Sequence, residues 1–451
     1  MKRLISFLIL TLAFHSCSFD NKTGLWKDAS NLEKIKEKQE KKHSKLKDVF
    51  LENRIFEEEK DVNFKTKIQI NSPLKTKFWT DSYFNLANNV SNIYYANEKY
   101  LVFKSSKLSR NFGNPNILFY NNNIISSDNK GTVYIYSLIQ KKKIFEYNFY
   151  KKKIKKYKKE ITIAINKGNI YASDNLGYVY AINISSGKLL WAKHFGIPFR
   201  SNIKIVNEKI FLADQDNRIY SLKSSNGEKI WEFSTSMTNL KSDFINNIAI
   251  DKKNSNIFFL NTSGELYSIN YLNQGINWFS NLKIKNSNTD SSLFLGSPLI
   301  LKDNKVIVSN GNFIFSYDAL SGSLIWKKNI STNVKGVLTK NNIFLFTKNN
   351  LLICLDLNTG KVIWSKNIFN QIRALDKKKL SNKIKKISNL VIANSKIFLF
   401  SLEGYLLSFD YRNGKIISIN KVLKSGLRGK PIFVDGHMYL FDNNYRLFKY
   451  K

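Results

Sequence analysis

A 13-residue frame that usually ends in tryptophan recurs through most of the chain after residue 110, and it restricts the possible folds more than any other feature. Its copies occupy residues 133–145, 179–191, 219–231, 266–278, 314–326, 352–364 and 406–418, with a truncated copy at 447–451. Successive tryptophans stand about 38 to 48 residues apart, a period that suits one four-stranded antiparallel blade per repeat. The sequence therefore predicts an all-β fold, an eight-bladed β-propeller over residues 74–451.

Each copy divides into four short strands in the same way. In the third blade we expect strands at Asn202–Val206, Lys209–Asp214, Arg218–Lys223 and Glu228–Phe233. These segments are rich in β-branched and aromatic residues, whereas the joints between them carry Asn, Ser and Gly, which tolerate positive φ. Helical periodicity is absent from the repeats, so they favour a purely β architecture.

The two ends of the chain are predicted to close the ring together. The last copy stops after its third strand, and Leu74–Thr80 resembles a lone fourth strand that ends in Trp79. If this strand completes the last blade as its outer strand, the third strand is not left as an exposed edge. We therefore expect residues 74–80 to pair with the C-terminal strand.

One side chain per blade stands at the end of the frame, and six of these eight positions are tryptophan. Each should pack against the neighbouring blade and bury on the order of 150–250 Å², so the role predicted for this set is structural. The positions other than Ser418 are Trp79, Phe145, Trp191, Trp231, Trp278, Trp326 and Trp364.

The N-terminus has the features of an export signal with a lipid attachment site. Lys2 and Arg3 precede a short apolar stretch that is too short to span a bilayer, and Cys17 follows it. We expect residues 1–16 to be a lipoprotein signal peptide, Cys17 to be acylated, and residues 17–73 to form a charged tether. Ser18, in place of an aspartate, favours the outer membrane. The alternative is an ordinary signal peptide with an incidental cysteine.

The formal net charge of +38 comes from 72 Lys and Arg against 34 Asp and Glu. Lysine far outnumbers arginine, whereas nucleic-acid readers rely on arginine forks. Asn, Ile and Phe are abundant too, as an A+T-rich genome would produce. No nucleic-acid partner is therefore expected, although a polyanion- or glycan-binding propeller stays open as an alternative.

The segment Asn358–Trp364, with its Thr-Gly-x-x-x-Trp ending, is similar to the repeat of pyrroloquinoline-quinone (PQQ) propellers. A lipidated N-terminus, a short tether, a lone tryptophan strand and seven full repeats before a three-stranded end resemble the layout of the BamB family. The resemblance implies a non-enzymatic scaffold lipoprotein of the outer-membrane β-barrel assembly (BAM) machinery, on the periplasmic face of the outer membrane. It implies as partners the POTRA domains of the barrel insertase BamA and other BAM subunits.

The same resemblance implies a contact surface on the loops that join adjacent blades. Leu240 and Lys241 lie near the family's Leu-Arg pair, with Met237 just before them. In the next such loop Asp290 is the acidic residue nearest to the family's acidic positions. We expect these four residues to contribute to partner binding, with lysine in place of the arginine fork.

A quinone-dependent dehydrogenase on the same fold is the enzymatic alternative. Such enzymes resemble this repeat but usually carry a calcium ion held by Glu, Asn and Asp, a catalytic Asp, and often adjacent cysteines. No adjacent cysteines, hydrolase motif or nucleotide-binding loop occurs here, so we expect no catalytic residue, metal or cofactor. His194 and His437 stand alone. The turn carboxylates are expected to bond their own backbone; they are Asp174, Asp214, Asp356 and Asp410.

Overall fold

The structure is a computed structural model of the whole chain, and it divides into two compact units, residues 1–55 and 56–451. It describes residues 17–19, 26–28, 55–63, 67–97, 100–150, 154, 156–237, 243–283, 293–332, 334–375 and 378–451. In the first unit, β1 (Cys17–Phe19) pairs with β2 (Trp26–Asp28) in an antiparallel hairpin.

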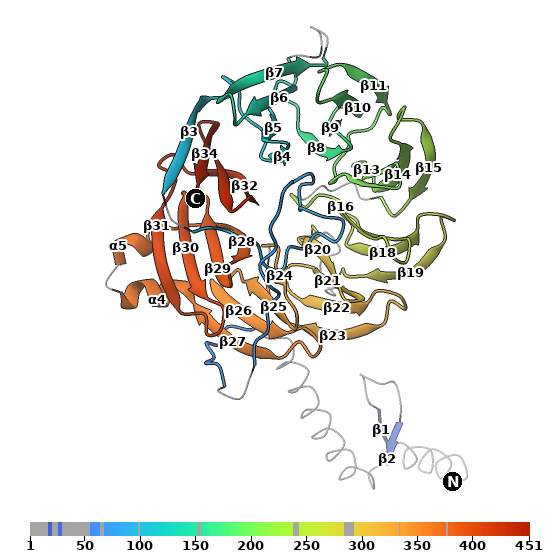
Figure 1. Cartoon of the computed structure of the whole chain (residues 1–451). Helices are drawn as coiled ribbons and strands as arrows, with labels where there is room; N and C mark the ends of the chain where they lie inside the picture. Colours follow the sequence, from blue (N-terminus) through green and yellow to red (C-terminus); the bar gives the residue numbers. More distant parts are fainter. Residues whose placement is uncertain are drawn as a thin grey trace, which may run out of the picture. The chain divides into compact units, whose positions relative to one another are not determined.

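The second unit is a ring of eight four-stranded antiparallel sheets (Figure 1), which confirms the predicted eight-bladed propeller. Blade one consists of β4 (Leu118–Tyr120), β5 (Asn123–Ser127), β6 (Thr132–Ser137) and β7 (Lys142–Asn148), and blade two of β8 (Ile161–Asn166), β9 (Asn169–Asp174), β10 (Tyr178–Asn183) and β11 (Leu189–His194). Blade three consists of β12 (Lys204–Val206), β13 (Lys209–Ala213), β14 (Arg218–Lys223) and β15 (Lys229–Ser234), and blade four of β16 (Asn247–Asp251), β17 (Asn256–Leu260), β18 (Glu265–Asn270) and β19 (Ile276–Asn281). Blade five consists of β20 (Ser297–Lys302), β21 (Lys305–Ser309), β22 (Ile314–Asp318) and β23 (Leu324–Lys328). Blade six consists of β24 (Val337–Leu338), β25 (Asn342–Phe346), β26 (Leu351–Asp356) and β27 (Val362–Asn367), and blade seven of β28 (Ile387–Ala393), β29 (Lys396–Ser401), β30 (Tyr405–Asp410) and β31 (Ile416–Lys421). Blade eight consists of β32 (Leu427–Val434), β33 (His437–Asp442), β34 (Arg446–Tyr450) and β3 (Leu101–Lys107).

The ring is closed by a different N-terminal strand from the predicted one. β3 pairs with β34 in an antiparallel ladder, so residues 101–107, not 74–80, complete blade eight. Phe103 lies opposite Lys449, in the register position where Trp231 lies opposite Ser221 in blade three. Phe103 also packs near the Tyr136 ring of blade one, with ring centroids 6.2 Å apart. Phe103 is therefore the fourth-strand aromatic residue of blade eight. The closing strand was missed in the sequence because it is rich in lysine and has phenylalanine where most repeats have tryptophan.

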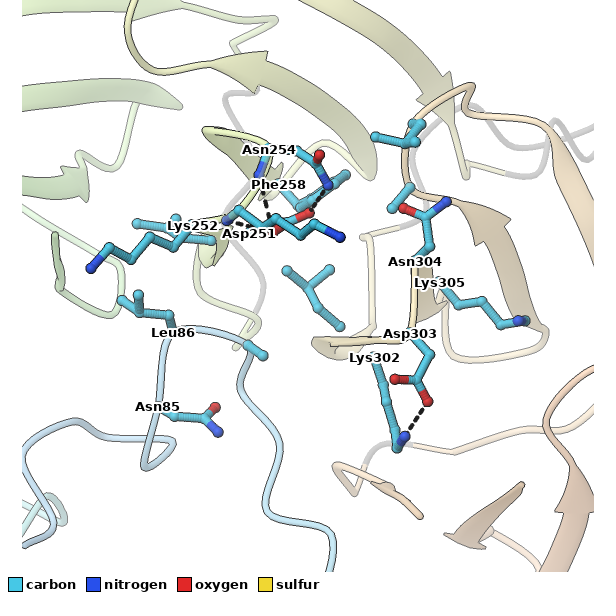
Figure 2. Close-up of a pocket in the computed structure, with 16 residues that line it drawn as sticks. Asn85, Leu86, Asp251, Lys252, Asn254, Phe258, Lys302, Asp303, Asn304 and Lys305 are labelled. Atoms are coloured by element: carbon cyan, nitrogen blue, oxygen red, sulfur yellow. Dashed lines mark hydrogen bonds and ion pairs between the residues drawn. The ribbon is translucent and has the colours of Figure 1, made fainter. Parts of the chain in front are cut away.

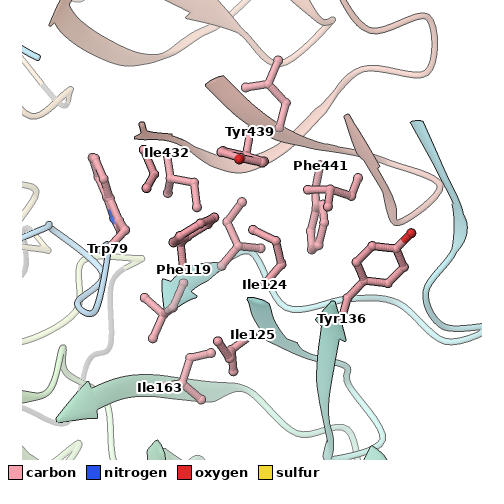
Figure 3. Packing of buried hydrophobic residues seen from close by; sticks show 14 of the residues in the cluster. Trp79, Phe119, Ile124, Ile125, Tyr136, Ile163, Ile432, Tyr439 and Phe441 are labelled. Atoms are coloured by element: carbon pink, nitrogen blue, oxygen red, sulfur yellow. The ribbon is translucent and has the colours of Figure 1, made fainter. Parts of the chain in front are cut away.

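Trp79 has another role, which corrects its predicted place in the blade-docking set. Its backbone N–H donates to Phe119 O at 2.9 Å and its carbonyl accepts from Phe119 N–H at 2.8 Å, so it pairs with innermost strand β4. Its buried ring packs 4.9 Å from Phe84. Figure 3 shows Trp79 in an apolar cluster with Phe119, Ile432 and Tyr439, between blades one and eight.

The tryptophans of four blades fasten each blade to the next one. The indole N–H donates to a carbonyl in the turn between the third and fourth strands of the following blade, at 3.0 to 3.2 Å. The pairs are Trp191 with Ser224, Trp278 with Ala319, Trp326 with Leu357, and Trp364 with Tyr411. Phe145, half-buried, packs on the equivalent turn of blade two at Gly187. All five side chains thus bridge a blade junction.

Each aromatic ring packs on a turn in which one residue has a positive φ and no room for a Cβ atom. A Cβ added to Gly322, whose φ is +73°, would lie 2.5 Å from Cγ of Trp278, and Gly227 and Gly360 stand in the same way against Trp191 and Trp326. Such close approach at positive φ is the condition that favours glycine. The repeated Gly of the frame is therefore explained by the tryptophan of the preceding blade.

The junction between blades three and four departs from this rule. Gln274, with φ of +65°, occupies the position that glycine holds in blades two, three, five, six and seven. Trp231 is buried, but within the described part of the chain its indole nitrogen has no hydrogen-bond partner. At this junction, therefore, Gln274 replaces the usual glycine, and among the described residues the indole N–H of Trp231 lacks the hydrogen bond that the four tryptophans above make.

The helices and the N-terminal approach to the ring belong to blades six and seven. Between these blades lie α4 (Ile368–Ala374), whose N-cap Asn367 accepts from Phe369 N–H and Asn370 N–H, and α5 (Lys378–Ser381). Residues 56–63 and 67–73, assigned to the tether from sequence, run along blade six; Lys60, for example, forms a backbone bridge with Ser365. The compact unit therefore begins at Phe56 rather than at residue 74. Among the helices of the described residues, none has the length and apolar character that a bilayer crossing requires.

Candidate partner-binding surface

The loops that join consecutive blades all emerge on one face of the ring. Because the four strands of a blade alternate in direction, turns between strands one and two and between three and four share one face. The connection from strand four to the next blade starts on the opposite face. Loops on a rigid scaffold are the usual carriers of binding residues, so this second face is the candidate partner-binding surface.

The loop after blade three starts from a well-fixed base. Asn217 Nδ2 donates to Ser236 O at 2.8 Å, and Ser263 Oγ donates to the same carbonyl at 3.0 Å. Thr235 Oγ1 donates to Asn217 O at 2.8 Å. The next residue, Met237, is 68% exposed. A flexible apolar side chain is thus held out to solvent by a rigid loop base.

The neighbouring loop, after blade four, presents two more apolar side chains. Leu293 and Leu295 are 45% and 50% exposed, whereas Phe294 between them is buried. The Phe294 ring contacts that of Phe244 edge-on, with centroids 5.2 Å apart. Since Phe244 ends the loop after blade three, the two loops share one small core beneath their exposed residues.

Of the predicted contact residues, only Met237 lies within the described residues. Leu240, Lys241 and Asp290 lie outside them, so their roles stay predictions. Leu293 and Leu295 follow Asp290 in the same loop, and neither was singled out from the sequence. Their exposure is the feature that adds them to the candidate surface.

A groove of about 740 Å³ lies on the other face of the ring, between blades four and five (Figure 2). Asp251 accepts from Lys253 N–H and Asn254 Nδ2, and Lys302 pairs with Asp303. These carboxylates are therefore engaged locally. The groove lies away from the interblade loops.

The axis of the ring is occupied by residues 74–96, which we call the axial segment (Figure 1). The segment contacts the innermost strands of blades one to seven in chain order. The contacts with blades one to four are made by Trp79 with Phe119, Thr80 with Ile165, Asp81 with Lys204, and Leu86 with Ile250. Those with blades five to eight are made by Ala87 with Leu301, Asn89 with Leu338, Ile93 with Ile392, and Thr76 with Asp435.

One residue of the axial segment joins two blades through its side chain. Buried Asn88 donates through Nδ2 to Ile248 O at 3.0 Å and to Leu299 O at 3.1 Å. These are the innermost strands of blades four and five. The axial course of this segment was not predicted, because residues 74–80 resemble a blade strand and residues 81–96 neither repeat nor show a strand pattern.

The turn carboxylates have the local backbone partners expected from the sequence. Asp174 accepts from Leu176 N–H and Tyr178 N–H at 2.8 and 2.9 Å, and Asp214, Asp356 and Asp410 accept from their own turns in the same way. Burial raises the pKa of Asp174. Among the described residues, no three His, Cys, Asp or Glu side chains gather where they could hold a metal ion.

Comparison with known proteins gives a family match over more than half of the chain. A family model described as "Outer membrane protein assembly factor BamB" matches residues 122–366. The BamB of Yersinia pestis is 26% identical over 159 residues, which are 35% of this chain and 36% of that protein. The BamB of Shewanella oneidensis is 23% identical over 285 residues, 62% of this chain and 67% of that protein. The chain thus matches about a third of one relative and two thirds of the other.

Solved structures show the same fold. The crystal structure of BamB from Moraxella catarrhalis matches with a TM-score of 0.62 at 14% identity, covering 78% of this chain and 99% of that one. A europium-containing methanol dehydrogenase matches with a TM-score of 0.59 at 14% identity, covering 81% of this chain and 89% of that one. At such identities the likeness concerns the fold alone, which scaffolds and enzymes share.

Proposed function

The chain belongs to the outer membrane protein assembly factor BamB family, and from this premise we propose that it is a non-enzymatic scaffold of the BAM machinery. In this role it binds the POTRA domains of a BamA-type insertase through its interblade loops. Acylated Cys17 holds it on the periplasmic face of the outer membrane. The family match over residues 122–366 is the observation that carries the proposal.

The surface on the interblade loops fits such a role. Met237, Leu293 and Leu295 are exposed apolar side chains on two loops that share the Phe244–Phe294 contact. A few apolar anchors on a rigid support match the general pattern of a small hydrophobic interface core. Leu240 and Lys241 fall in the same loop as Met237.

Binding of the purified protein to a purified POTRA fragment tests the proposal. Two double variants, Met237→Glu with Leu293→Glu and Leu240→Glu with Lys241→Glu, should each cost at least about 2 kcal/mol, or roughly 30-fold in affinity. Both introduce negative charge outside the strands, so the melting temperature should hardly change. The matched control is Leu272→Glu, a leucine that is 60% exposed on a turn of the opposite face.

Three outcomes would count against the interface. If neither double variant weakens binding, the POTRA contact lies elsewhere. If Leu272→Glu weakens it as much, the effect is one of overall charge. If the parent protein does not bind the fragment, the scaffold role itself is wrong.

The anchor is tested separately. Cys17→Ser should abolish labelling with a clickable palmitate and release the protein from the membrane fraction, because stable anchoring needs acyl chains. The released protein should keep the parent's circular dichroism and POTRA affinity. Labelling that persists in the variant would place the lipid elsewhere.

The dehydrogenase alternative has a direct assay. The purified protein with pyrroloquinoline quinone and Ca²⁺ should reduce no redox dye with alcohols or sugars beyond a heat-treated sample. Saturable turnover would replace the scaffold proposal with an enzymatic one.

A further inference from the structure

Three lysines converge on the axial segment from different blades. Lys204 of β12 is fully buried, and its Nζ donates to Asp81 Oδ2 at 2.8 Å and to Asn85 O at 2.6 Å. Lys335 precedes β24, and Lys430 lies in β32. Asp81 pairs with Lys204 and so balances the charge of one of these three lysines.

The other two lysines contact only uncharged groups among the described residues. Lys335 Nζ donates to Asn88 O at 3.1 Å and to Gly336 O at 3.3 Å. Lys430 Nζ donates to Ser82 O at 3.2 Å and lies 3.4 Å from the centre of the Tyr83 ring. An ammonium group has three donors, so both keep hydrogen-bonding capacity that these carbonyls do not use.

Both lysines line a small cavity beside the axial segment. The cavity has a volume of about 60 Å³, and Ser82, Tyr83 and Asn389 are also in its wall. It exceeds the roughly 10–15 Å³ that one water needs and is far below the roughly 300–1,000 Å³ of organic ligand pockets. The buried Ser82 Oγ, in the same wall, has no hydrogen-bond partner among the residues that the structure describes. Space, unused donors and an orphaned hydroxyl thus meet at one place.

The charges around this cavity are out of balance. Burial lowers the pKa of Lys430 to about 7, with repulsion from Lys335 adding to the effect. Burial, with repulsion from Lys204, lowers the pKa of Lys335 to about 8. The groups facing Lys430 are Asp81, Tyr83, Lys204 and Lys335. Both side chains are partly buried. An ammonium group withdrawn from water without a counterion is costly, and a bound anion reduces that cost.

We propose that this cavity is a binding site for a small inorganic oxyanion of the sulfate or phosphate type. Lys335 and Lys430 supply the charge, and the Ser82 hydroxyl donates a third hydrogen bond. The anion bridges the axial segment to blades six and eight. The proposal does not depend on the scaffold function.

Sulfate is the suitable probe, because its charge is constant near neutral pH. At fixed ionic strength and about pH 6, calorimetric titration of the purified protein should show one saturable site, and sulfate should raise the melting temperature. The double variant Lys335→Met with Lys430→Met should lose at least tenfold in affinity, and Ser82→Ala should lose severalfold. The matched control, Lys142→Met with Lys188→Met, removes two charges from exposed lysines and should bind as the parent does.

A second measurement needs no variant. Because the ammonium groups lose their protons through about pH 7 and 8, sulfate affinity of the parent should fall between about pH 6 and pH 9. An equal melting response in the parent and both double variants would be the general stabilisation by excluded salts and would overturn the proposal. Absence of saturable binding, or binding unaffected by pH, would overturn it as well.

Discussion

The perimeter and the axis of the ring hold the blades together in different ways. At the perimeter, one contact type recurs, an aromatic side chain from one blade on the turn of the next, and each contact joins two neighbours. At the axis, the axial segment contacts all eight blades through groups that differ from blade to blade. A contact that recurs in the repeats can be recognised in the sequence. A segment that occurs only once can contact every blade and still show no recognisable sequence pattern.

The largest effect is expected at the perimeter. Trp364 is fully buried and donates to Tyr411 O. Trp364→Ala should lower the free energy of unfolding by about 3–5 kcal/mol, because it leaves a cavity between blades six and seven. Denaturant unfolding measures this change. A loss of less than about 1 kcal/mol would mean that the indole packing is not what joins these blades.

At the axis, the expected loss is somewhat smaller. Asn88→Ala removes a donor from both Ile248 O and Leu299 O, although Ile248 O still accepts from Asn202 Nδ2. We expect a loss of about 2–3 kcal/mol in unfolding free energy. Asn88 has φ of +57°, so the matched control is exposed Asn207→Ala at φ of +49°. If both variants lose the same amount, backbone strain explains the loss and the axial hydrogen bonds contribute little.

The fit of glycine against tryptophan can be separated from its backbone freedom. Gly322→Ala places a Cβ 2.5 Å from Trp278, whereas Gly168→Ala, at a similar φ of +76°, meets its nearest atom only at 4.0 Å. Both should lose about 1–2 kcal/mol from the left-handed backbone, and Gly322→Ala should lose about 1 kcal/mol more from overpacking. Thermal melting of the pair measures the difference. Equal losses would remove the steric explanation for the repeated glycine.

The smallest effect is a gain. Gln274→Gly should relieve the strain of a side chain at φ of +65° and increase the free energy of unfolding by about 0.5–1 kcal/mol. Lys141, with φ of +53° at the equivalent turn of blade one, gives a parallel variant, Lys141→Gly. Melting temperatures of the two single variants test the rule. A loss at Gln274 would show that its side chain stabilises the junction.

The repeat predicted the blades because its strand pattern, turns and aromatic position recur together. The prediction was wrong at 74–80 for a physical reason. Trp79 follows an extended stretch, as a fourth-strand tryptophan does, but its backbone pairs with an innermost strand. The true closing strand places Phe103 in the aromatic register among lysines, and nothing in its composition marks it.

The candidate site was only partly predictable. The interblade loops and Met237 were expected from the resemblance to the BamB family. Exposure of Leu293 and Leu295 depends on how Phe294 packs beneath them, which no local pattern reports. The lysine cavity joins residues from the axial segment and two distant blades, so only the folded ring brings its parts together.

The order of the chain has a consequence for how the ring assembles. The axial segment is made before any blade, whereas β3 can pair only with β34, which is made last. Contacts such as Asn88 with Leu299 and β3 with β34 join residues far apart in sequence, and contacts of this kind slow folding. Blades one to seven can therefore pack one after another on the axial segment, which is already synthesised. We expect the pairing of β3 with β34, which closes the ring, to be the last and slowest step.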